Sequence, residues 1–252
     1  MNVGSYTSAA ALTALEKWQE ITSQNISAGT VPGFKKTNVS FKSIEFDKAM
    51  AEAERQGAAS QTARMPTPNT KINFTQGPIN QTELETDFAI QGRGFFQIIL
   101  PSGEVAYTRN GSFYINANNT LVTKEGYPVS GGGGPIVFEP EKEPITINSE
   151  GTIMQGERPV AILNVYDTPN PGEMRRIGDG LFVPLNPDQG VVEVRESRVM
   201  NRALEGSNLN QMKEMIDLIT VSRSYAAVQK VLTTLDENTG KAISSLGNPI
   251  SA

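Results

Sequence analysis

The sequence predicts an α+β protein that is mainly β, with an antiparallel barrel-like or sandwich-like central domain and a helix at each end. Two stretches carry apolar residues at helical spacing, one in the first thirty residues and one of almost forty residues near the C-terminus. Between them, short apolar runs alternate with turn-forming residues every eight to twelve positions, which is typical of antiparallel strands. We expect the two helices to form a coiled-coil assembly domain.

Residues 1–47 are expected to form a helix followed by a turn. Ala11, Leu15 and Trp18 repeat at spacings of four and three, which places them on one helix face, and Leu12 flanks this stripe. The pattern ends in the stretch NISAGTVPGF, because its glycines and proline disfavour a helix. Since Trp18 belongs to the stripe, we predict that it packs against the protein rather than against a ligand.

Residues 48–82 are expected to be an extended linker. The stretch is polar and lacks a sustained apolar period. Pro66 and Pro68 push the residues before them out of the helical region of backbone conformation. So long a connection is uncommon inside a compact domain, so the segment is expected to be a linker or a functional loop.

Residues 83–205 are expected to form the central β-domain. The run DFAIQGRGFFQIIL contains apolar segments of strand length. The pairs Asn110-Gly111 and Asn118-Asn119 tolerate positive φ and predict tight hairpins. The Gly-x-Gly in QGRGFF is expected to serve turns rather than to bind phosphate, because an apolar strand follows it where a phosphate loop would need a helix.

Residues 206–252 are expected to form one long helix, which would approach ~60 Å at about 1.5 Å per residue. Asn208 as N-cap with Gln211 three residues later resembles a capping box. The helix carries two apolar rows. The first row consists of Leu209, Met212, Ile216 and Ile219, and the second consists of Leu218, Val221, Tyr225, Val228, Leu232, Leu235, Thr239, Ala242 and Leu246. The second row has the three-four spacing of a coiled-coil seam. One row can pack on the N-terminal helix, and the other therefore needs another copy of the protein or a relative.

Composition excludes several functions. The 252 residues contain no cysteine and no histidine, so thiolate catalysis, a Ser-His-Asp triad and a Cys/His zinc site are impossible. The net charge of −5 argues against nucleic-acid binding. The pairs Glu83/Glu85 and Glu141/Glu143 lack the spacing of a calcium loop and are expected to be solvated surface residues. We therefore expect no enzymatic activity, no cofactor and no metal.

The sequence also disfavours direct membrane insertion. Nowhere do 18 apolar residues run together, and the N-terminus lacks the basic and strongly apolar regions of a signal peptide. Basic and acidic residues balance along 209–246, whereas helices that lie on membranes are usually rich in lysine and arginine. If the protein is exported, we expect export without a cleaved signal peptide.

Three stretches resemble signature motifs of the bacterial flagellar rod and hook proteins. ITSQNISAGTVPGFKK is similar to the N-terminal signature, with Gln24 where an asparagine is usual. DFAIQGRGFFQI, followed by YTRNGSF and LVTKEGYPV, resembles the central β-domain motif. LEGSNLNQMKEMIDLITVSRSYAAVQKVL is similar to the C-terminal signature, although VRESRVMNRALEGSN departs from the usual Gln-Gly before it. The length fits rod subunits better than the longer hook subunit, and YTSAAAL and LDENTGKAISSL resemble the proximal rather than the distal type of rod protein.

The resemblance implies a structural subunit of the flagellar basal-body rod, which spans the periplasm. It implies that the terminal helices polymerise with copies of the protein and with neighbouring rod proteins, line the export channel and transmit torque. It also implies passage through the flagellar type III export apparatus. The residues predicted for the assembly interface are Leu12, Leu15, Trp18, Asn25, Leu218, Tyr225, Val228, Leu232, Leu235 and Leu246.

Two alternatives remain open at this point. The first is a distal rod or hook-type subunit of the same family. The second is an exported β-rich protein that binds or cleaves glycans. Aromatic residues make up only 7% of the chain, which disfavours the second alternative because a glycan cleft needs aromatic platforms.

Overall fold

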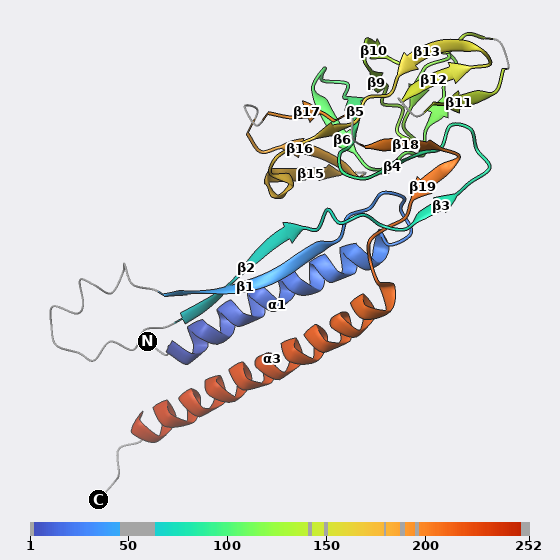
Figure 1. Ribbon diagram of the computed structural model, residues 1–252. Coiled ribbons are helices and arrows are strands. Elements are labelled where there is room, and N and C mark those ends of the chain that lie inside the picture. The colour runs from blue at the N-terminus through green and yellow to red at the C-terminus, as the bar shows by residue number, and fades with distance from the viewer. Residues whose placement is uncertain are drawn as a thin grey trace, which may run out of the picture. The chain divides into compact units, whose positions relative to one another are not determined.

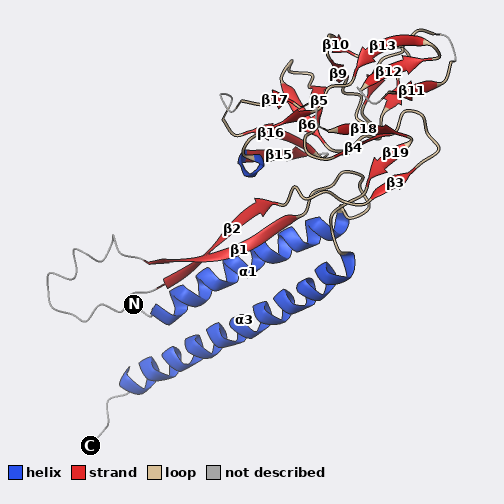
Figure 2. Ribbon diagram, viewed as in Figure 1, coloured by secondary structure: helices blue, strands red, loops and turns tan. Residues whose placement is uncertain are grey.

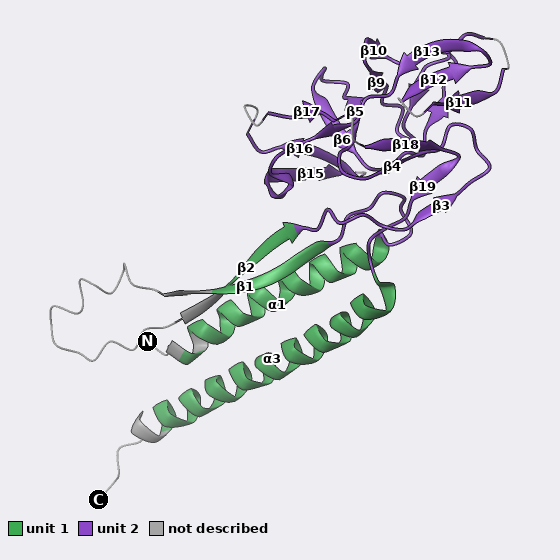
Figure 3. Ribbon diagram, in the orientation of Figure 1, with its two compact units in different colours: residues 1–27, 37–71, 210–252 green, residues 28–36, 72–209 purple. Residues whose placement is uncertain are grey.

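The protein is mainly β, with one helix near each end of the chain (Figure 2). The computed structural model describes residues 3–45, 64–140, 143–148, 151–178, 180–186, 190–194 and 197–247. The chain divides into two compact units (Figure 3). Unit 1 comprises Met1–Ser27, Thr37–Lys71 and Asn210–Ala252, and unit 2 comprises Ala28–Lys36 and Ile72–Leu209.

Unit 1 is built from both ends of the chain. It contains helix α1 (Val3–Ser27), strands β1 (Thr37–Glu45) and β2 (Arg64–Ile72), and helix α3 (Gln211–Gly247). Helix α1 contacts β1 on one side and α3 on the other (Figure 1). Both predicted terminal helices are thus present, and the 37 residues of α3 correspond to about 55 Å.

The strand pair of unit 1 was not predicted. Strand β1 lies where only a turn was expected, and β2 lies in the stretch predicted as a linker. The two prolines of β2, Pro66 and Pro68, argue against a strand in a sequence pattern, although proline is tolerated on a sheet edge. The rest of the predicted linker up to residue 63 lies outside the described residues.

The helices of unit 1 rest on specific side-chain contacts. The Trp18 ring packs edge-on against Phe41 of β1, with 5.6 Å between the ring centroids. Ala14 and Ile21 of α1 are buried, and so is Val221 of α3. The lone tryptophan is therefore a packing residue, as its place in the stripe predicts.

Unit 2 is a set of short antiparallel strands. They are β3 (Ile79–Gln81), β4 (Phe88–Gln91), β5 (Phe96–Ile99), β6 (Val105–Thr108), β7 (Tyr114–Ile115), β8 (Leu121–Val122), β9 (Val129–Gly131), β10 (Gly134–Pro135), β11 (Ile145–Ile147), β12 (Thr152–Gln155), β13 (Arg158–Ile162), β14 (Tyr166–Asp167), β15 (Met174–Gly178), β16 (Leu181–Pro184), β17 (Val192–Glu193), β18 (Arg198–Asn201) and β19 (Ala203–Glu205). A short 3-10 helix, Pro171–Glu173, precedes β15.

The sheets of unit 2 stay open. The largest has six strands in the order β10-β9-β5-β6-β16-β15, and a second has the order β11-β12-β13. The remaining strands of the unit form the pairs β14-β17, β18-β4, β19-β3 and β7-β8. None of these described sheets closes into a barrel, so the predicted barrel is wrong. The strands are two to five residues long, and β10 and β15 remain the two edges of the largest sheet.

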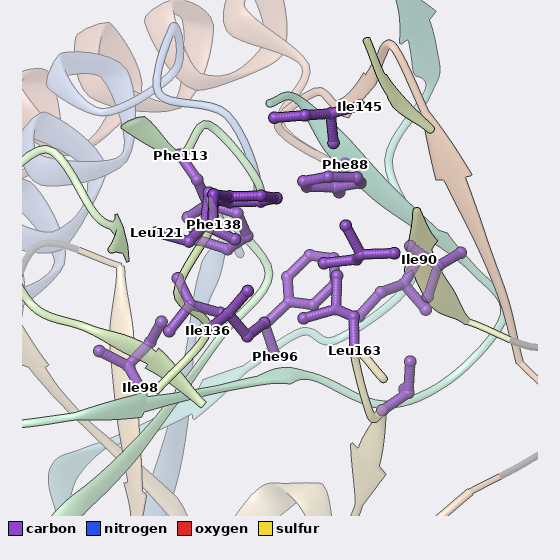
Figure 4. Packing of buried hydrophobic residues seen from close by; sticks show 14 of the residues in the cluster. Phe88, Ile90, Phe96, Ile98, Phe113, Leu121, Ile136, Phe138, Ile145 and Leu163 are labelled. Atoms are coloured by element: carbon purple, nitrogen blue, oxygen red, sulfur yellow. The ribbon is translucent and has the colours of Figure 1, made fainter. Parts of the chain in front are cut away.

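The core of unit 2 is apolar and aromatic (Figure 4). Phe96 and Phe113 meet edge-on with 5.4 Å between their ring centroids, a geometry that aromatic quadrupoles favour. The buried residues labelled in Figure 4 are Phe88, Ile90, Phe96, Ile98, Phe113, Leu121, Ile136, Phe138, Ile145 and Leu163. These residues come from many strands, so this core connects several of the separate sheets. A second, smaller cluster of the unit contains Phe95, Tyr107, Met174 and Phe182.

One predicted hairpin is present and the other is not. Asn119 has a φ of 56° in the turn between β7 and β8, as the Asn118-Asn119 pair predicts. Asn110-Gly111 lies between β6 and β7, which belong to different sheets. Gly111 is needed there because a Cβ atom would lie 1.7 Å from the carbonyl oxygen of Phe88. Glycine serves close backbone approach at this position rather than a hairpin.

Candidate assembly surface and buried junction

Helices α1 and α3 of unit 1 run antiparallel. Near the end of α1, Asn25 Nδ2 donates a hydrogen bond of 3.1 Å to Glu214 Oε2 in the first turn of α3. Farther along, the Tyr225 hydroxyl donates a 3.1 Å hydrogen bond to Glu16 Oε1. Toward the start of α1, Ala11 and Val228 line the same shallow apolar groove. Residue numbers therefore rise along α3 as they fall along α1.

Asn25 lies inside the chain rather than on its surface. Its Nδ2 also donates to the Thr37 carbonyl at 2.9 Å, and its Oδ1 accepts from the Thr37 N–H at 3.0 Å. The side chain is 2% exposed. This asparagine, predicted for the assembly interface, connects the end of α1 with the starts of β1 and α3.

The N-cap of helix α3 lies two residues later than predicted. Asn210 is the N-cap, because its Oδ1 accepts a hydrogen bond of 3.1 Å from the Lys213 N–H. The prediction that Asn208 caps α3 is therefore wrong. Its side chain is committed to other segments of unit 2, as described below.

The second apolar row of α3 faces α1 in its first part, whereas Thr239 and Ala242 of the same row are exposed. Val221 is fully buried, and Tyr225 and Val228 contact α1 as described above. The side chain of Leu246 lies outside the described residues. The other predicted interface residues of the two helices are half-buried within the chain: Leu12, Leu15, Trp18, Leu218, Tyr225, Val228, Leu232 and Leu235.

The first apolar row of α3 is the one that stays uncovered. Met212, Ile216 and Ile219 are 70%, 57% and 54% exposed, and Met215 beside them is 45% exposed. We define these four residues as the outer row. Four large apolar side chains within two helical turns form an exposed patch of the kind that marks an interaction surface.

A cluster of buried charges lies in unit 2. Glu205 and Lys35 are fully buried, and Lys35 Nζ donates to Glu205 Oε1 at 2.5 Å. Arg109 is 4% exposed and donates from Nη1 to Glu205 Oε2 at 3.0 Å. We call these three residues the buried junction. Each belongs to one of the three family-like motifs, so motifs far apart in the sequence meet at one carboxylate.

Backbone groups add further hydrogen bonds to the buried junction, although Arg109 Nε is buried without a hydrogen-bond partner. Lys35 Nζ donates to the Thr75 carbonyl at 2.8 Å, and Glu205 Oε1 accepts from the Gly77 N–H at 2.8 Å. Arg109 Nη2 donates to the Gly92 carbonyl at 2.7 Å. Burial lowers the pKa of Lys35, and the Glu205 carboxylate acts in the opposite direction. Burial likewise lowers the pKa of Arg109.

Asn208 ties the segments next to the buried junction. Its Oδ1 accepts from the Lys36 N–H at 2.8 Å. Its Nδ2 donates to the carbonyl oxygens of Asn73 and Thr75 at 2.8 and 3.0 Å. These contacts explain why this asparagine does not cap α3.

A second cation lies over the aromatic residue of the N-terminal motif. The Arg176 guanidinium is 4.5 Å from the ring centroid of Phe34, and it also donates a hydrogen bond to the Lys35 carbonyl. Burial lowers the pKa of Arg176. The Pro-Gly-Phe-Lys stretch is therefore held from both its backbone and its side chains.

Sequence reasoning did not predict the buried junction. Lys35 and Glu205 were named as parts of motifs, but no ion pair between them was expected. No local signal was available, because charged residues beside glycine-containing turns usually lie at the surface. The pairing itself depends on contacts across 170 positions of sequence.

One of the predicted surface carboxylates has a structural role. Glu85 accepts a 2.9 Å hydrogen bond from the Ile145 N–H and pairs with Arg202 at 2.5 Å. Glu141 lies outside the described residues. Among the described residues, no group of three or more aspartate or glutamate side chains could hold a metal ion.

We expect Glu85→Gln to weaken unit 2 at neutral pH by less than about 1 kcal/mol, because solvent screens this partly exposed pair. The hydrogen bond from Ile145, together with Arg202, lowers the pKa of Glu85 below its ordinary 4.5. A lowered carboxyl pKa stabilises the fold above pH 4.5 and loses this effect as the pH falls through the folded-state pKa. Urea unfolding of both proteins should therefore differ at neutral pH and converge in acid. A difference that grows in acid would contradict this assignment.

The fold and these sites define a chain whose two ends pair as helices and leave an apolar row uncovered. In the described part of the chain, no helix is long and apolar enough to cross a membrane. Two family models match: the flagellar hook protein FlgE/F/G D1 domain over residues 89–155, and the flagellar basal body rod FlgEFG protein C-terminal region over residues 200–245.

Curated relatives match over nearly the full chain. The flagellar basal-body rod protein FlgF of Salmonella typhimurium is 30% identical, with 94% of this chain and 95% of the relative covered. FlgF of Caulobacter vibrioides is 30% identical over 92% of this chain and 93% of the relative. The flagellar basal-body rod protein FlgG of Borreliella burgdorferi is 31% identical over 94% and 96%. The chain therefore belongs to the family of flagellar basal-body rod proteins, which places it in the flagellar basal body.

Proposed function

We propose that this protein is a rod subunit of the proximal type that polymerises through unit 1. Its partners are copies of itself and neighbouring rod proteins. In the assembled rod the helices line the export channel, and the subunit transmits torque through noncovalent contacts. The flagellar type III export apparatus delivers the chain without cleavage of a signal peptide.

The outer row of α3 carries this proposal. Covering a large apolar side chain is favourable by roughly 1.5–3 kcal/mol when burial is complete. Met212 and Ile216 are more than half exposed in the single chain, so a neighbouring helix that covered them would gain much of this energy. Helices that pack in this way insert side chains of one into gaps of the other, as in a coiled coil.

The half-buried residues of the second row fix the orientation of α3, and thereby of the outer row. Leu218, Val228 and Leu232 hold α3 on α1, which keeps the outer row on the opposite side of the helix. Part of each side chain stays accessible, so the predicted interface residues can also contribute contacts at the rim of a neighbouring helix. Assembly then depends on both rows.

A distal rod position is the second candidate. The similarity to the Borreliella FlgG at 31% identity over 94% of this chain favours it, whereas the similarities to FlgF favour the proximal position. Locating the tagged protein relative to other rod proteins in purified basal bodies distinguishes the two positions.

We expect Ile216→Asp combined with Ile219→Asp to abolish incorporation into the rod. Both side chains are exposed, so the fold of the single chain should be retained while the apolar contact with a neighbour is lost. The measurement is the amount of protein in basal bodies purified from a strain that lacks the wild-type gene, together with swimming.

Ile162→Asp combined with Ile177→Asp is the matched control. These isoleucines are 50% and 41% exposed on unit 2, away from the helices in sequence. The control protein should enter basal bodies normally. Normal incorporation of the outer-row variant would mean that the neighbouring subunit binds elsewhere.

A further inference from the structure

We propose that the buried junction and Asn208 form a mechanical joint within unit 2, which holds the three segments that lead to unit 1 in one fixed arrangement relative to one another. This inference rests on the proposed function as a torque-transmitting rod subunit. It assigns positioning roles to Lys35, Arg109, Glu205 and Asn208, which act through the backbone segments that they bind.

The chain passes between the units four times. The crossings follow Ser27, Lys36, Lys71 and Leu209. Three segments of unit 2 therefore lead to unit 1: residues 28–36, the stretch from residue 72 onward, and the stretch that ends at residue 209. Any force that the helices pass along the chain to unit 2 must travel through these segments.

Hydrogen bonds connect the segments directly beside the crossings. The Asn73 N–H donates to the Lys36 carbonyl at 2.8 Å. The Asn208 carboxamide binds both of these residues and Thr75, as described above. Residues 36, 73 and 208 lie within two positions of a crossing, so the segments are joined to one another where they leave unit 2.

The buried junction anchors the same three segments in unit 2. The Gly33 N–H donates to the Glu205 backbone carbonyl at 2.7 Å. Lys35 and Glu205 bind Thr75 and Gly77 through their side chains. Arg109 then connects the carboxylate of Glu205 to the β-domain through the carbonyl of Gly92.

Backbones of these segments are in direct contact. Gly33 has a φ of 68°, and a Cβ atom there would lie 2.4 Å from backbone atoms of Arg109 and Asn110. A Cβ atom on Gly77 would lie 2.1 Å from the carbonyl oxygen of Gly206. The segments cannot move closer, and their hydrogen bonds prevent them from moving apart.

A charged cluster suits a joint better than an apolar one. Buried charges require their partners in one geometry, because an unpaired buried charge is strongly unfavourable. Apolar side chains would tolerate sliding of one segment past another. The buried junction therefore fixes the register of the segments, and a load on one of them is shared by all three.

The test distinguishes a loss of the fixed arrangement of the three segments from a loss of folding stability. Lys35→Met combined with Glu205→Gln removes one cation and the carboxylate charge together, so it breaks the ion pair without changing the net charge. Arg158→Met combined with Glu139→Gln makes the same change at an exposed pair of unit 2, whose atoms are 2.7 Å apart. Because the chain has no cysteine, the substitutions Thr30→Cys and Lys124→Cys introduce the only two sites that a thiol-reactive spin label can modify. Pulsed electron resonance then measures how firmly the segment 28–36 is held on unit 2.

We expect the junction variant to enter basal bodies, to show a broader distance distribution than the wild type, and to lose swimming as the viscosity of the medium rises. The exposed-pair control should match the wild type in all three measurements. If the junction variant fails to fold, the Asn208→Ala variant tests the proposal instead, because it leaves the ion pairs intact. It should show the same broader distance distribution and the same loss of swimming in viscous medium.

If the junction variant shows a distance distribution as narrow as that of the wild type, or swims normally in viscous medium, the proposal of a joint is wrong. Failure of the proposed function has a different signature. In that case the wild-type protein itself would be missing from purified basal bodies, whatever the distance distributions show.

Discussion

Glu205→Gln is expected to destabilise unit 2 by about 3–5 kcal/mol, the cost of removing one partner from a buried ion pair. The change leaves Lys35 and Arg109 as two buried cations without their common carboxylate. Lys35→Met should cost less, because Glu205 keeps its ion pair with Arg109 at 3.0 Å and its bond from Gly77. Urea unfolding followed by the near-ultraviolet signal of the tyrosines of unit 2 measures both effects. Equal losses for the two variants would contradict the shared role of the carboxylate.

The loss of unfolding free energy caused by Glu205→Gln should also become smaller as the pH rises. Burial lowers the pKa of Lys35 below its ordinary 10.5, so the unfolded chain binds more protons than the folded chain between the folded-state pKa and pH 10.5. Stability from this group therefore increases with pH. Without the opposing carboxylate the folded-state pKa of Lys35 falls further, and the increase begins at a lower pH. Unfolding measured at neutral pH and at pH values approaching 10.5 checks the sign.

Leu232→Glu is expected to disrupt unit 1 and abolish rod assembly while unit 2 unfolds as in the wild type. Leu232 lies half-buried on the row of α3 that faces α1, so a carboxylate there faces an apolar contact. We expect a loss of at least about 2 kcal/mol from the helix pair. Trp18 is the only tryptophan and lies on α1, so its fluorescence reports unit 1 separately. Cells that carry this variant should lack flagella.

Lys230→Glu is the control for this change, because Lys230 is exposed on the same helix two residues away. It should leave Trp18 fluorescence and swimming close to the wild type. Normal rods in Leu232→Glu cells would show that assembly does not depend on this row.

The two helices could be predicted because their signal is local. In α3, apolar residues recur at three and four positions over many turns, and glycine and proline in the NISAGTVPGF stretch mark the end of the region of α1. The existence of two apolar rows was also evident. The sequence did not indicate which row would face α1, because both rows have helical spacing and the choice depends on how the two helices meet.

The errors concern contacts between distant segments. Strand β2 forms against β1 although Pro66 and Pro68 weaken its pattern, because pairing with β1 outweighs local preference. Asn208 has the sequence context of a cap, but hydrogen-bond partners more than 130 positions away take its side chain. Closure of a barrel likewise depends on which strands pair, and periodicity does not encode partners.

The buried junction is the largest feature that the pattern could not reveal. Charged residues are usually assigned to the surface, whereas Lys35, Arg109 and Glu205 are buried together, paired with one another and with backbone groups. Each one alone resembles a surface residue of a turn. Three segments had to be placed in space before their charges became partners.

Unit 1 joins the two ends of the chain, and this has a consequence for the order of folding. Asn25 and Glu214 are 189 positions apart, so closing the helix pair requires a long loop whose entropy cost must be met first. Long-range contacts of this kind form late. Synthesis delivers the N-terminus first, so β-domain residues 72–209 are available before α3 exists. The outer row is therefore synthesised only after the β-domain, and a chain cut short before residue 210 has no such surface with which to interfere in growth of the rod.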